Sequence, residues 1–460
     1  MSGTISSLGL GSSIDLQGTL DSLREIDQEV ITAKEAKVSA YETQLSEFTV
    51  VQGKLLDMKG YALELSLEST FISRDATVSD ASVLTLATSD GAAVQDTQVT
   101  VTALAARSSW IADGVAGQTT VVYDAESDES TTFSYQLGET TVTLAVAGGT
   151  TLMELAELIN NDASNPGVTA SLVNNGDADN PYQLVLQADE TGEDNRISLL
   201  TQLSALALTE KTGADGASLN ARFSVDGIDY QRQSNTITDI IPSVQFTLQG
   251  TGASTISVSN DEEKIKELIT NLVTAYNDIL TEISANSGYD TDTEELGILA
   301  STGFDDLPSS MQNLMNTFIQ AGSDSPVTSI FDLGLSYESD GTITIDDDTL
   351  TTMLEENFAD LAAFFNGDDD SDITGFADKV SDFLRNAATE DSGIYASETS
   401  LVQQRIDSLE EQIEKDTERL DKKYEILTKQ YVELDSYLSE MTSMSDYLTQ
   451  TFAAITGSSD

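Results

Sequence analysis

Carboxylates are the residues in this sequence whose number and spacing could support chemistry. The chain has 79 Asp and Glu residues, and paired carboxylates serve as general acid and base in many enzymes. With so many of them, pairs arise by chance throughout, and no Ser-His, Lys or phosphate-loop pattern accompanies any pair. The sequence also lacks histidine, the commonest general base and metal ligand. We therefore predict no catalytic residues and no cofactor, and we expect that the protein is not an enzyme.

One acidic stretch has the spacing of a calcium-binding loop. Asp368, Asp370 and Asp372 alternate as the first ligands of an EF-hand do. Ile373, however, stands where that loop requires glycine, and Lys379 stands where it requires a bidentate Glu. A solvated acidic turn after Gly367 is the preferred interpretation, and no metal site is predicted.

Composition excludes several classes of partner. The 460 residues contain no cysteine, so neither disulfides nor thiolate metal sites are available. The formal net charge of −58 predicts a surface that repels nucleic acid and anionic membranes, and it is typical of proteins from saline habitats. No apolar run approaches the length of a transmembrane helix, and the N-terminus lacks the pattern of a Sec signal peptide. We expect no nucleic-acid binding and no membrane insertion.

The longest pattern in the chain is an apolar seam from about Leu401 to Phe452. Its steps of three and four residues are typical of a helix that packs against a partner helix. Two successive four-residue steps, through Ile413 to Thr417, form a stutter that locally unwinds a coiled coil. Some fifty helical residues would make a rod of roughly 75 Å, which favours a coiled coil over a helix lying on its own globular core. The predicted seam residues are Leu409, Ile413, Leu420, Tyr424, Leu427, Tyr431, Leu434, Leu438, Met441 and Leu448.

The beginning of the chain mirrors its end. Asp15 is predicted to cap a helix, and apolar seam residues follow at Leu16, Leu20, Leu23, Ile26 and Val30. A second periodic run extends from Val38 to Leu65 and contains no proline. Because the two seams lie at opposite ends, we expect the terminal helices to pair with each other and to carry the rest of the chain as a head.

The middle of the chain changes from strand patterns to helical patterns. Alternation typical of strands fills residues 71–258, interrupted by one helix predicted at 151–160, and a helical period returns from Asn260. Later helices are expected at 307–321, 348–365 and 375–388, with a hairpin at 335–345. The predicted fold class is α+β and multidomain, with terminal coiled-coil helices, a helical bundle domain and two inserted β-rich domains. The coiled-coil leg segments are expected at 1–40 and 396–460. The helical domain is expected to combine 41–70 with 261–395, and the inner β-rich domain to combine 71–106 with 220–260. The outer β-rich insertion is expected at 107–219.

The two ends of the sequence carry a family resemblance. The stretch Ile5–Leu16 closely resembles the N-terminal signature of the bacterial flagellar filament cap family, also called hook-associated protein 2. The signature residues are Leu8, Gly9, Leu10, Gly11, Ile14, Asp15 and Leu16. Residues 63–89, 333–345 and 393–450 continue the resemblance, and residues 138–186 are similar to an insertion module of flagellins and hook proteins.

This resemblance implies a function in assembly. Members of the family form a homo-oligomeric ring at the extracellular tip of the flagellum, promote polymerisation of exported flagellin and prevent its leakage. The implied partners are other copies of the chain, flagellin, hook–filament junction proteins and a cytoplasmic export chaperone that binds the C-terminal helix. Export by the flagellar type III system, without a cleaved signal peptide, is also implied. Two alternatives stay open: another flagellar axial protein (a hook–filament junction protein or flagellin), and a surface adhesin that acts through the outer β-rich domain.

Overall fold

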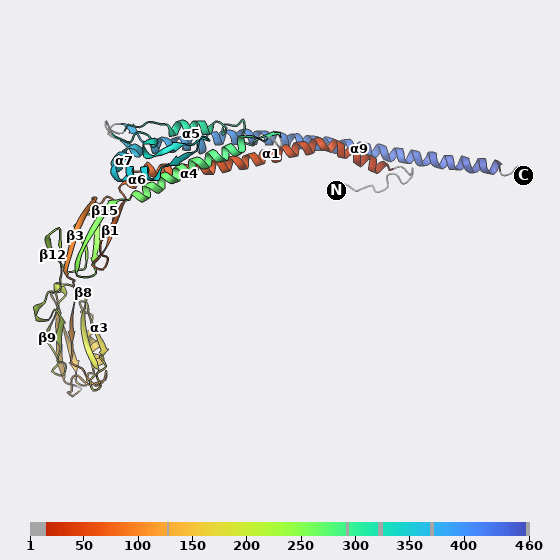
Figure 1. Cartoon of the computed structure of the whole chain (residues 1–460). Helices are drawn as coiled ribbons and strands as arrows, with labels where there is room; N and C mark the ends of the chain where they lie inside the picture. The colour runs from red at the N-terminus through yellow and green to blue at the C-terminus, as the bar shows by residue number, and fades with distance from the viewer. Residues whose placement is uncertain (1–14, 127, 291–293, 321–324, 369–371, 457–460) are drawn as a thin grey trace. The chain divides into compact units, whose positions relative to one another are not determined.

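The computed structural model describes residues 15–126, 128–290, 294–320, 325–368 and 372–456, which form two compact units (Figure 1). Met1–Glu68 and Glu262–Asp460 form one unit, here called the helical unit. Ser69–Asp261 form the other, here called the β unit. Along the sequence, the chain leaves the helical unit within the short helix α2 (Glu68–Phe71).

Two long helices made from the chain's ends dominate the helical unit. They are α1 (Leu16–Leu65) and α9 (Ile394–Thr456). The Asp15 side chain accepts a hydrogen bond from the Gly18 N–H at 2.8 Å, which confirms the predicted cap. The other elements of this unit are α4 (Glu262–Ser287), β16 (Tyr289–Asp290), β17 (Glu295–Leu296), α5 (Leu307–Met315), the 3₁₀-helix η3 (Ile330–Leu333), β18 (Leu335–Tyr337), β19 (Ile343–Ile345), α6 (Asp347–Glu356), α7 (Phe358–Asn366), β20 (Gly367–Asp368), β21 (Ile373–Thr374) and α8 (Phe376–Ala388).

The C-terminal half of α1 forms part of this unit's core. Its buried residues recur every three or four positions, so they share one face, which packs against α4 and α8. The Phe48 and Phe304 rings lie 4.9 Å apart between centroids, and the Gln52 amide donates to the Ala388 carbonyl at 2.8 Å. The buried residues of this face are Phe48, Val51, Leu55, Met58, Ala62 and Leu65.

The helices of this unit differ from the predicted runs and helices at three places. The two N-terminal runs form one continuous helix, α1. The helix predicted at 348–365 is two helices, because the chain leaves the helical conformation at Asn357, whose φ is −131°. The helix predicted at 307–321 ends at Met315, where the Asn316 N–H bonds the Gln312 carbonyl. The first two differences have the same cause. The spacing of apolar residues predicts helical segments, but it does not show whether the helix continues from one apolar run to the next.

The β unit contains two separate hydrophobic cores. The first, here called the inner core, lies in a five-stranded sheet of order β1-β15-β3-β11-β12 and a three-stranded sheet of order β13-β14-β2. Alternate residues of these strands are buried, as in β14, so each sheet contributes one apolar face. The strands are β1 (Arg74–Val78), β2 (Leu84–Thr88), β3 (Gln95–Ala103), β11 (Ala221–Val225), β12 (Ile228–Arg232), β13 (Thr236–Ile241), β14 (Val244–Leu248) and β15 (Gly252–Asn260).

The second core, here called the outer core, is inserted in the sequence between β3 and β11. It combines a four-stranded sheet of order β10-β4-β8-β7, a three-stranded sheet of order β6-β5-β9 and the helix α3 (Leu152–Asn161). Thr151 and Glu154 form a capping box at the start of α3, close to the predicted start. The strands are β4 (Arg107–Ile111), β5 (Ser130–Leu137), β6 (Thr140–Ala147), β7 (Val168–Asn174), β8 (Tyr182–Thr191), β9 (Ile197–Thr201) and β10 (Thr209–Thr212). Two 3₁₀-helices, η1 (Glu193–Asn195) and η2 (Ala214–Gly216), complete the unit.

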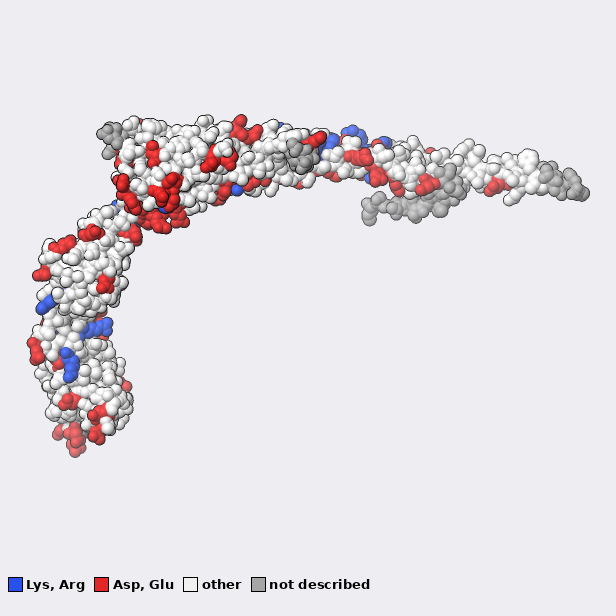
Figure 2. Space-filling view, viewed as in Figure 1, with Lys and Arg blue, Asp and Glu red and all other residues white. Residues whose placement is uncertain are grey.

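The predicted fold class is confirmed, since the chain combines terminal helices, a helical core and two β-rich cores. Figure 2 shows Asp and Glu side chains spread over the visible face of both units, with only scattered Lys and Arg. In the part of the chain that the structure describes, every helix is either too short or too polar to cross a bilayer.

Candidate assembly surface

The N-terminal part of α1 pairs with α9 in an antiparallel arrangement. Arg24 lies 2.5 Å from Asp421, and Lys34 lies 2.7 Å from Asp416, so residue numbers rise on one helix as they fall on the other. Both ion pairs are partly exposed, and such pairs contribute about 1 kcal/mol or less each. They therefore set the register of the two helices more than they stabilise the pair.

A small apolar cluster holds the same two helices together. Leu20 and Ile31 of α1 are buried against Leu420 and Tyr424 of α9. Ile413 and Leu427 pack against this cluster from α9. The helix pair therefore depends on few apolar contacts, unlike the face of α1 that lines the helical core.

A polar group completes the contact between the helices. Asp27 accepts hydrogen bonds from the Lys423 ammonium at 2.5 Å and from the Tyr424 hydroxyl at 2.7 Å. These bonds, the Lys423 bond first, hold the pKa of Asp27 below its ordinary value. Desolvation in the contact, followed by the hydrogen bond to Asp27, raises the pKa of Tyr424 to about 12.

The structure divides the predicted seam of α1 into buried and exposed residues. Leu23, Ile26 and Val30 are 41%, 62% and 60% exposed, so they make no buried contact with α9. Ile31 and Asp27 take their place facing α9, and neither belonged to the predicted seam. The apolar spacing indicated a helix correctly, but the contact face includes a carboxylate that a search for apolar positions passes over. Leu16 and Leu20 are buried as a seam residue would be.

The predicted seam of α9 divides into a buried part and an exposed part. Leu420 and Tyr424 are buried, and Leu409, Ile413, Leu427, Tyr431 and Leu438 are half-buried. Leu434, Met441 and Leu448 are exposed, so they make no buried contact within the subunit. Tyr437, Met444 and Phe452 are exposed as well.

These exposed residues form an apolar stripe along the end of α9. Positions 434, 437, 441, 444, 448 and 452 follow steps of three and four, so they share one helix face. We call these six residues the α9 stripe. The predicted seam includes Leu438 and omits Tyr437 and Met444. The spacing of Tyr437 and Met444 from Leu434 would have indicated that they lie on the same helix face. Exposed apolar patches of this kind mark surfaces that bind other proteins.

Two earlier predictions fall partly on residues outside those described. The family signature residues Leu8, Gly9, Leu10, Gly11 and Ile14 lie outside the described residues, while Asp15 and Leu16 begin α1.

In the acidic stretch, Asp370 also lies outside the described residues. Asp368 pairs with Ile373 in the short hairpin of β20 and β21. Within the described residues, no group of acidic side chains is arranged to hold a metal ion.

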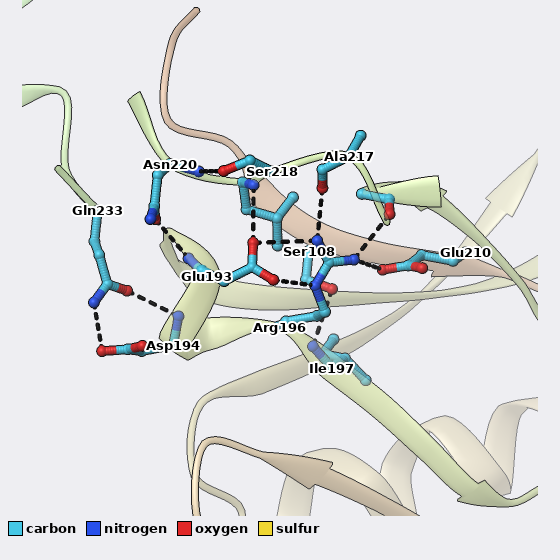
Figure 3. Close-up of polar contacts among 12 residues, drawn as sticks. Ser108, Glu193, Asp194, Arg196, Ile197, Glu210, Ala217, Ser218, Asn220 and Gln233 are labelled. Atoms are coloured by element: carbon cyan, nitrogen blue, oxygen red, sulfur yellow. Dashed lines mark hydrogen bonds and ion pairs between the residues drawn. The ribbon is translucent and has the colours of Figure 1, made fainter. Parts of the chain in front are cut away.

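A polar cluster around Arg196 links residues beside strands of the outer core with residues of the segment that leads into the inner core (Figure 3). The Arg196 guanidinium contacts Glu193 at 2.7 Å and Glu210 at 2.5 Å, and it donates to the carbonyls of Gly213 at 2.8 Å and Ala217 at 2.6 Å. Hydrogen bonds from Arg196 hold the pKa of Glu193 below its ordinary value. One side chain therefore ties η1 and β10 to the segment that returns the chain to the inner core.

Further bonds cross directly from the outer segment to the inner one. The Glu193 N–H donates to the Asn220 side chain at 2.8 Å, and the Asp194 N–H donates to the Gln233 side chain at 2.9 Å (Figure 3). The Gln233 amide in turn donates to the Asp194 carboxylate. Sequence patterns gave no sign of this cluster, because its bonded side chains include a pair 39 positions apart.

Comparisons with known proteins match this chain along most of its length. The family profile described as "Flagellar hook-associated protein 2 N-terminus" matches residues 12–108, and the one described as "Flagellar hook-associated protein 2 C-terminus" matches residues 218–443. The "Flagellin hook IN motif" matches residues 132–190, within the outer core.

Individual relatives agree with these profiles. The chain is 28% identical to flagellar hook-associated protein 2 of Campylobacter jejuni over 82% of its own length, but it spans only 65% of that relative. It is 26% identical to the A-type flagellar hook-associated protein 2 of Pseudomonas aeruginosa, covering 88% of this chain and 86% of that relative. The crystal structure of the D1-D2-D3 domains of the flagellar cap protein FliD from Escherichia coli matches with a TM-score of 0.50 at 20% identity. The match covers 77% of this chain and 99% of that one, which shows a shared fold.

Proposed function

The chain belongs to the flagellar hook-associated protein 2 family, and we propose that it caps the tip of a bacterial flagellar filament as a homo-oligomeric ring. Beneath this cap, exported flagellin would fold, join the filament and be kept from leaking into the medium. The action is steric and conformational: subunits hold a gap at the filament end and release it as each flagellin is added. A closed ring requires that one face of each subunit bind a different face of its neighbour.

The observation that carries this proposal is the α9 stripe. Its six large apolar side chains are exposed in the isolated chain, although burying one such side chain is worth about 1.5–3 kcal/mol. A helix that keeps such a stripe in water is suited to docking against another protein. At a filament tip, that protein would be a terminal flagellin subunit or a neighbouring copy of this chain.

The finer assignments rest on the family resemblance and are part of the same proposal. They are contacts with flagellin and hook–filament junction proteins, an export chaperone bound to the C-terminal helix, and export through the flagellar type III system. We also propose that residues 1–40 and 396–460 act as legs below a head divided into the helical, inner β and outer β domains predicted from the sequence. The predicted seam residues that are exposed, such as Ile26 and Val30, would then contact other subunits rather than α9.

The alternative of another axial protein has less support. A "Flagellin hook IN motif" alone would suit flagellin or a hook protein equally well. Here it lies between the two hook-associated protein 2 profiles, which match the segments before and after it. Adhesion through the outer core has no observation of its own in its favour.

The test replaces part of the α9 stripe in a strain that carries only the altered chain. Met441, Met444 and Leu448 are changed together to Gln, a polar residue that favours helix. We expect short or absent filaments and flagellin in the medium, while the melting curve of the purified chain stays unchanged because these residues are exposed. The matched control is Leu200→Gln, which alters a 55% exposed residue of β9. Normal filaments from the triple variant would refute docking through this stripe.

A further inference from the structure

The free edge of strand β6 is an open hydrogen-bonding surface that the proposed cap function does not use. In the outer core's three-stranded sheet of order β6-β5-β9, β6 is a terminal strand, and β5 is its only strand partner among the described residues. Leu137 and Thr140 face each other across the two-residue turn at Gly138, whose φ is +55°. Because antiparallel pairs alternate, residues 140, 142, 144 and 146 bond β5, and residues 141, 143, 145 and 147 direct their backbone groups outward.

Except for the Ala147 carbonyl, these outward groups are available in the part of the chain that the structure describes. The Ala147 carbonyl accepts bonds from the Thr150 N–H at 3.2 Å and the Thr150 hydroxyl at 2.7 Å. The outward N–H and C=O groups of Thr143 and Ala145, by contrast, bond no other described group. The strand also contains neither a charged residue nor a proline, the residues by which proteins commonly protect an edge from pairing.

The neighbouring edge strand shows what protection looks like in the same core. β7 is the last strand of the four-stranded sheet, so one of its edges is free of strands too. There the Asn160 side chain accepts from the Ala170 N–H and donates to the Ala170 carbonyl, each at 2.8 Å. The Asn165 side chain bonds the N–H and C=O of Val168 in the same way, each at 2.8 Å. Two side chains thus take the place of a strand along β7, while along β6 the described side chains bond only the Ala147 carbonyl.

A groove of about 780 Å³ runs along the open edge, between β6 and α3. Its apolar lining includes Ala145, Ala147 and Leu158, and Leu158 is 39% exposed. A strand added to β6 would lie about 4.8 Å from it, which places the strand in this groove. The groove therefore supplies apolar contacts beside the unpaired backbone groups.

Charge selects the occupant. The carboxylates of Glu154, Glu157 and Asp162 line the groove on the α3 side, and the described lining contains no Lys or Arg. A second copy of β6 would bring a second set of these carboxylates from a chain of net charge −58. An extended segment that carries Lys or Arg beside uncharged β-branched residues fits both the edge and its acidic border.

We propose that the groove between β6 and α3 binds an extended, basic polypeptide segment of another protein by adding it as a strand to β6. Backbone hydrogen bonds to Thr143 and Ala145 supply the attachment, and the carboxylates on α3 supply the preference for basic segments. This inference does not depend on the cap function.

The test measures binding of a labelled peptide to the full chain by fluorescence anisotropy. The probe has the sequence Lys-Thr-Val-Thr-Val-Thr-Lys with blocked ends. Its counterparts carry Glu in place of Lys, or Pro in place of the central Thr, which removes a backbone donor. We expect saturable binding of the Lys peptide, and binding at least tenfold weaker for each counterpart at low salt.

The matched variant is Ala145→Pro. The Ala145 N–H points away from β5, so proline removes an outward donor and keeps the β5–β6 bonds, as edge strands tolerate. We expect at least tenfold weaker binding with an unchanged melting curve. Thr143→Lys, which places a positive charge on the edge, serves as a second variant if Ala145→Pro fails to fold, and it should weaken binding equally.

Three results would overturn the proposal. The first is no saturable binding of the Lys peptide to the full chain. The second is equal binding by the variants or by the Pro peptide, which would show a purely ionic attraction. The third is self-association of the chain, measured by sedimentation, that Ala145→Pro abolishes, which would make a second copy the occupant of the edge.

Discussion

The contact between the terminal helices predicts a large difference between two isoleucines five positions apart. Ile31 is 2% exposed and lies in the cluster with Leu420 and Tyr424, whereas Ile26 is 62% exposed on the same helix. Ile31→Ala removes the equivalent of about three buried methylene groups at about 0.8 kcal/mol each, and the cavity left behind adds to this cost. We expect a loss of about 2–4 kcal/mol for opening the helix pair, and less than about 0.5 kcal/mol for Ile26→Ala.

Hydrogen exchange of the full chain measures this difference locally. Since 1.4 kcal/mol corresponds to a factor of ten, protection of amides in residues 24–34 and 413–427 should fall by about 30- to 700-fold in Ile31→Ala. Amides of α4, which packs on the other end of α1, should keep their protection in both variants and serve as the internal reference. Equal losses in the two variants would refute the assignment of the contact face. Unchanged exchange in Ile31→Ala would show that the pair opens independently of its apolar cluster.

Three further predictions concern stability. Arg196→Met should lower the melting temperature of the β unit by several degrees. Loss of the Arg196 hydrogen bonds costs about 1–3 kcal/mol of stability, and each kcal/mol shifts the melting temperature of a domain of this size by about 2–4 °C. The control is Arg222→Met, which changes an exposed arginine. Glu47→Gln should raise the urea midpoint of the chain at pH 8 but not at pH 4. Burial first, and the Glu282 carboxyl second, raise the pKa of Glu47 in the folded chain. The protonated carboxyl therefore contributes stability below the pKa that Glu47 has in the unfolded chain. This contribution is lost as the pH rises through the raised pKa of the folded chain. An equal gain at both pH values would contradict that origin. Gly53→Ala should stabilise α1 by about 0.5–1 kcal/mol, because alanine favours helix and its methyl group would meet nothing within 4 Å. Thermal melting measures this gain, and a lower melting temperature would mean that the site is crowded.

Much of the local structure was predictable because it depends on neighbours in the sequence. The Asp15 cap, the start of α3 at its capping box and the hairpin of β18 and β19 each involve residues a few positions apart. Alternating burial in β6 likewise follows from the geometry of a strand. The long apolar period at the end of the chain was readable for the same reason, and together with the strand and helix patterns of the middle it predicted the α+β multidomain class.

The choice of contact face was decided only by tertiary structure. The sequence shows that α1 and α9 have apolar residues at helical spacing, but it does not show which of them face the partner helix. The pairing geometry, with Asp27 placed against Lys423 and Tyr424, turns Ile31 inward and leaves Leu23, Ile26 and Val30 outside. The spacing of apolar residues does not predict that a carboxylate lies in the contact. The cost of desolvating Asp27 is offset by hydrogen-bond partners about 400 residues away in the sequence.

The same reason separates the two edges of the outer core. Composition alone makes β6 and β7 similar, since both are strands of mainly uncharged, β-branched or small residues. Asn165 bonds Val168 from only three positions away, but the fold brings Asn160 onto the backbone of Ala170, ten positions away, and leaves β6 beside an acidic groove. Sequence determines which residues form strands and helices, because that depends on local backbone and side-chain preferences. Whether an edge is closed or open depends on which side chains the packed chain brings to it, and tertiary structure alone decides that.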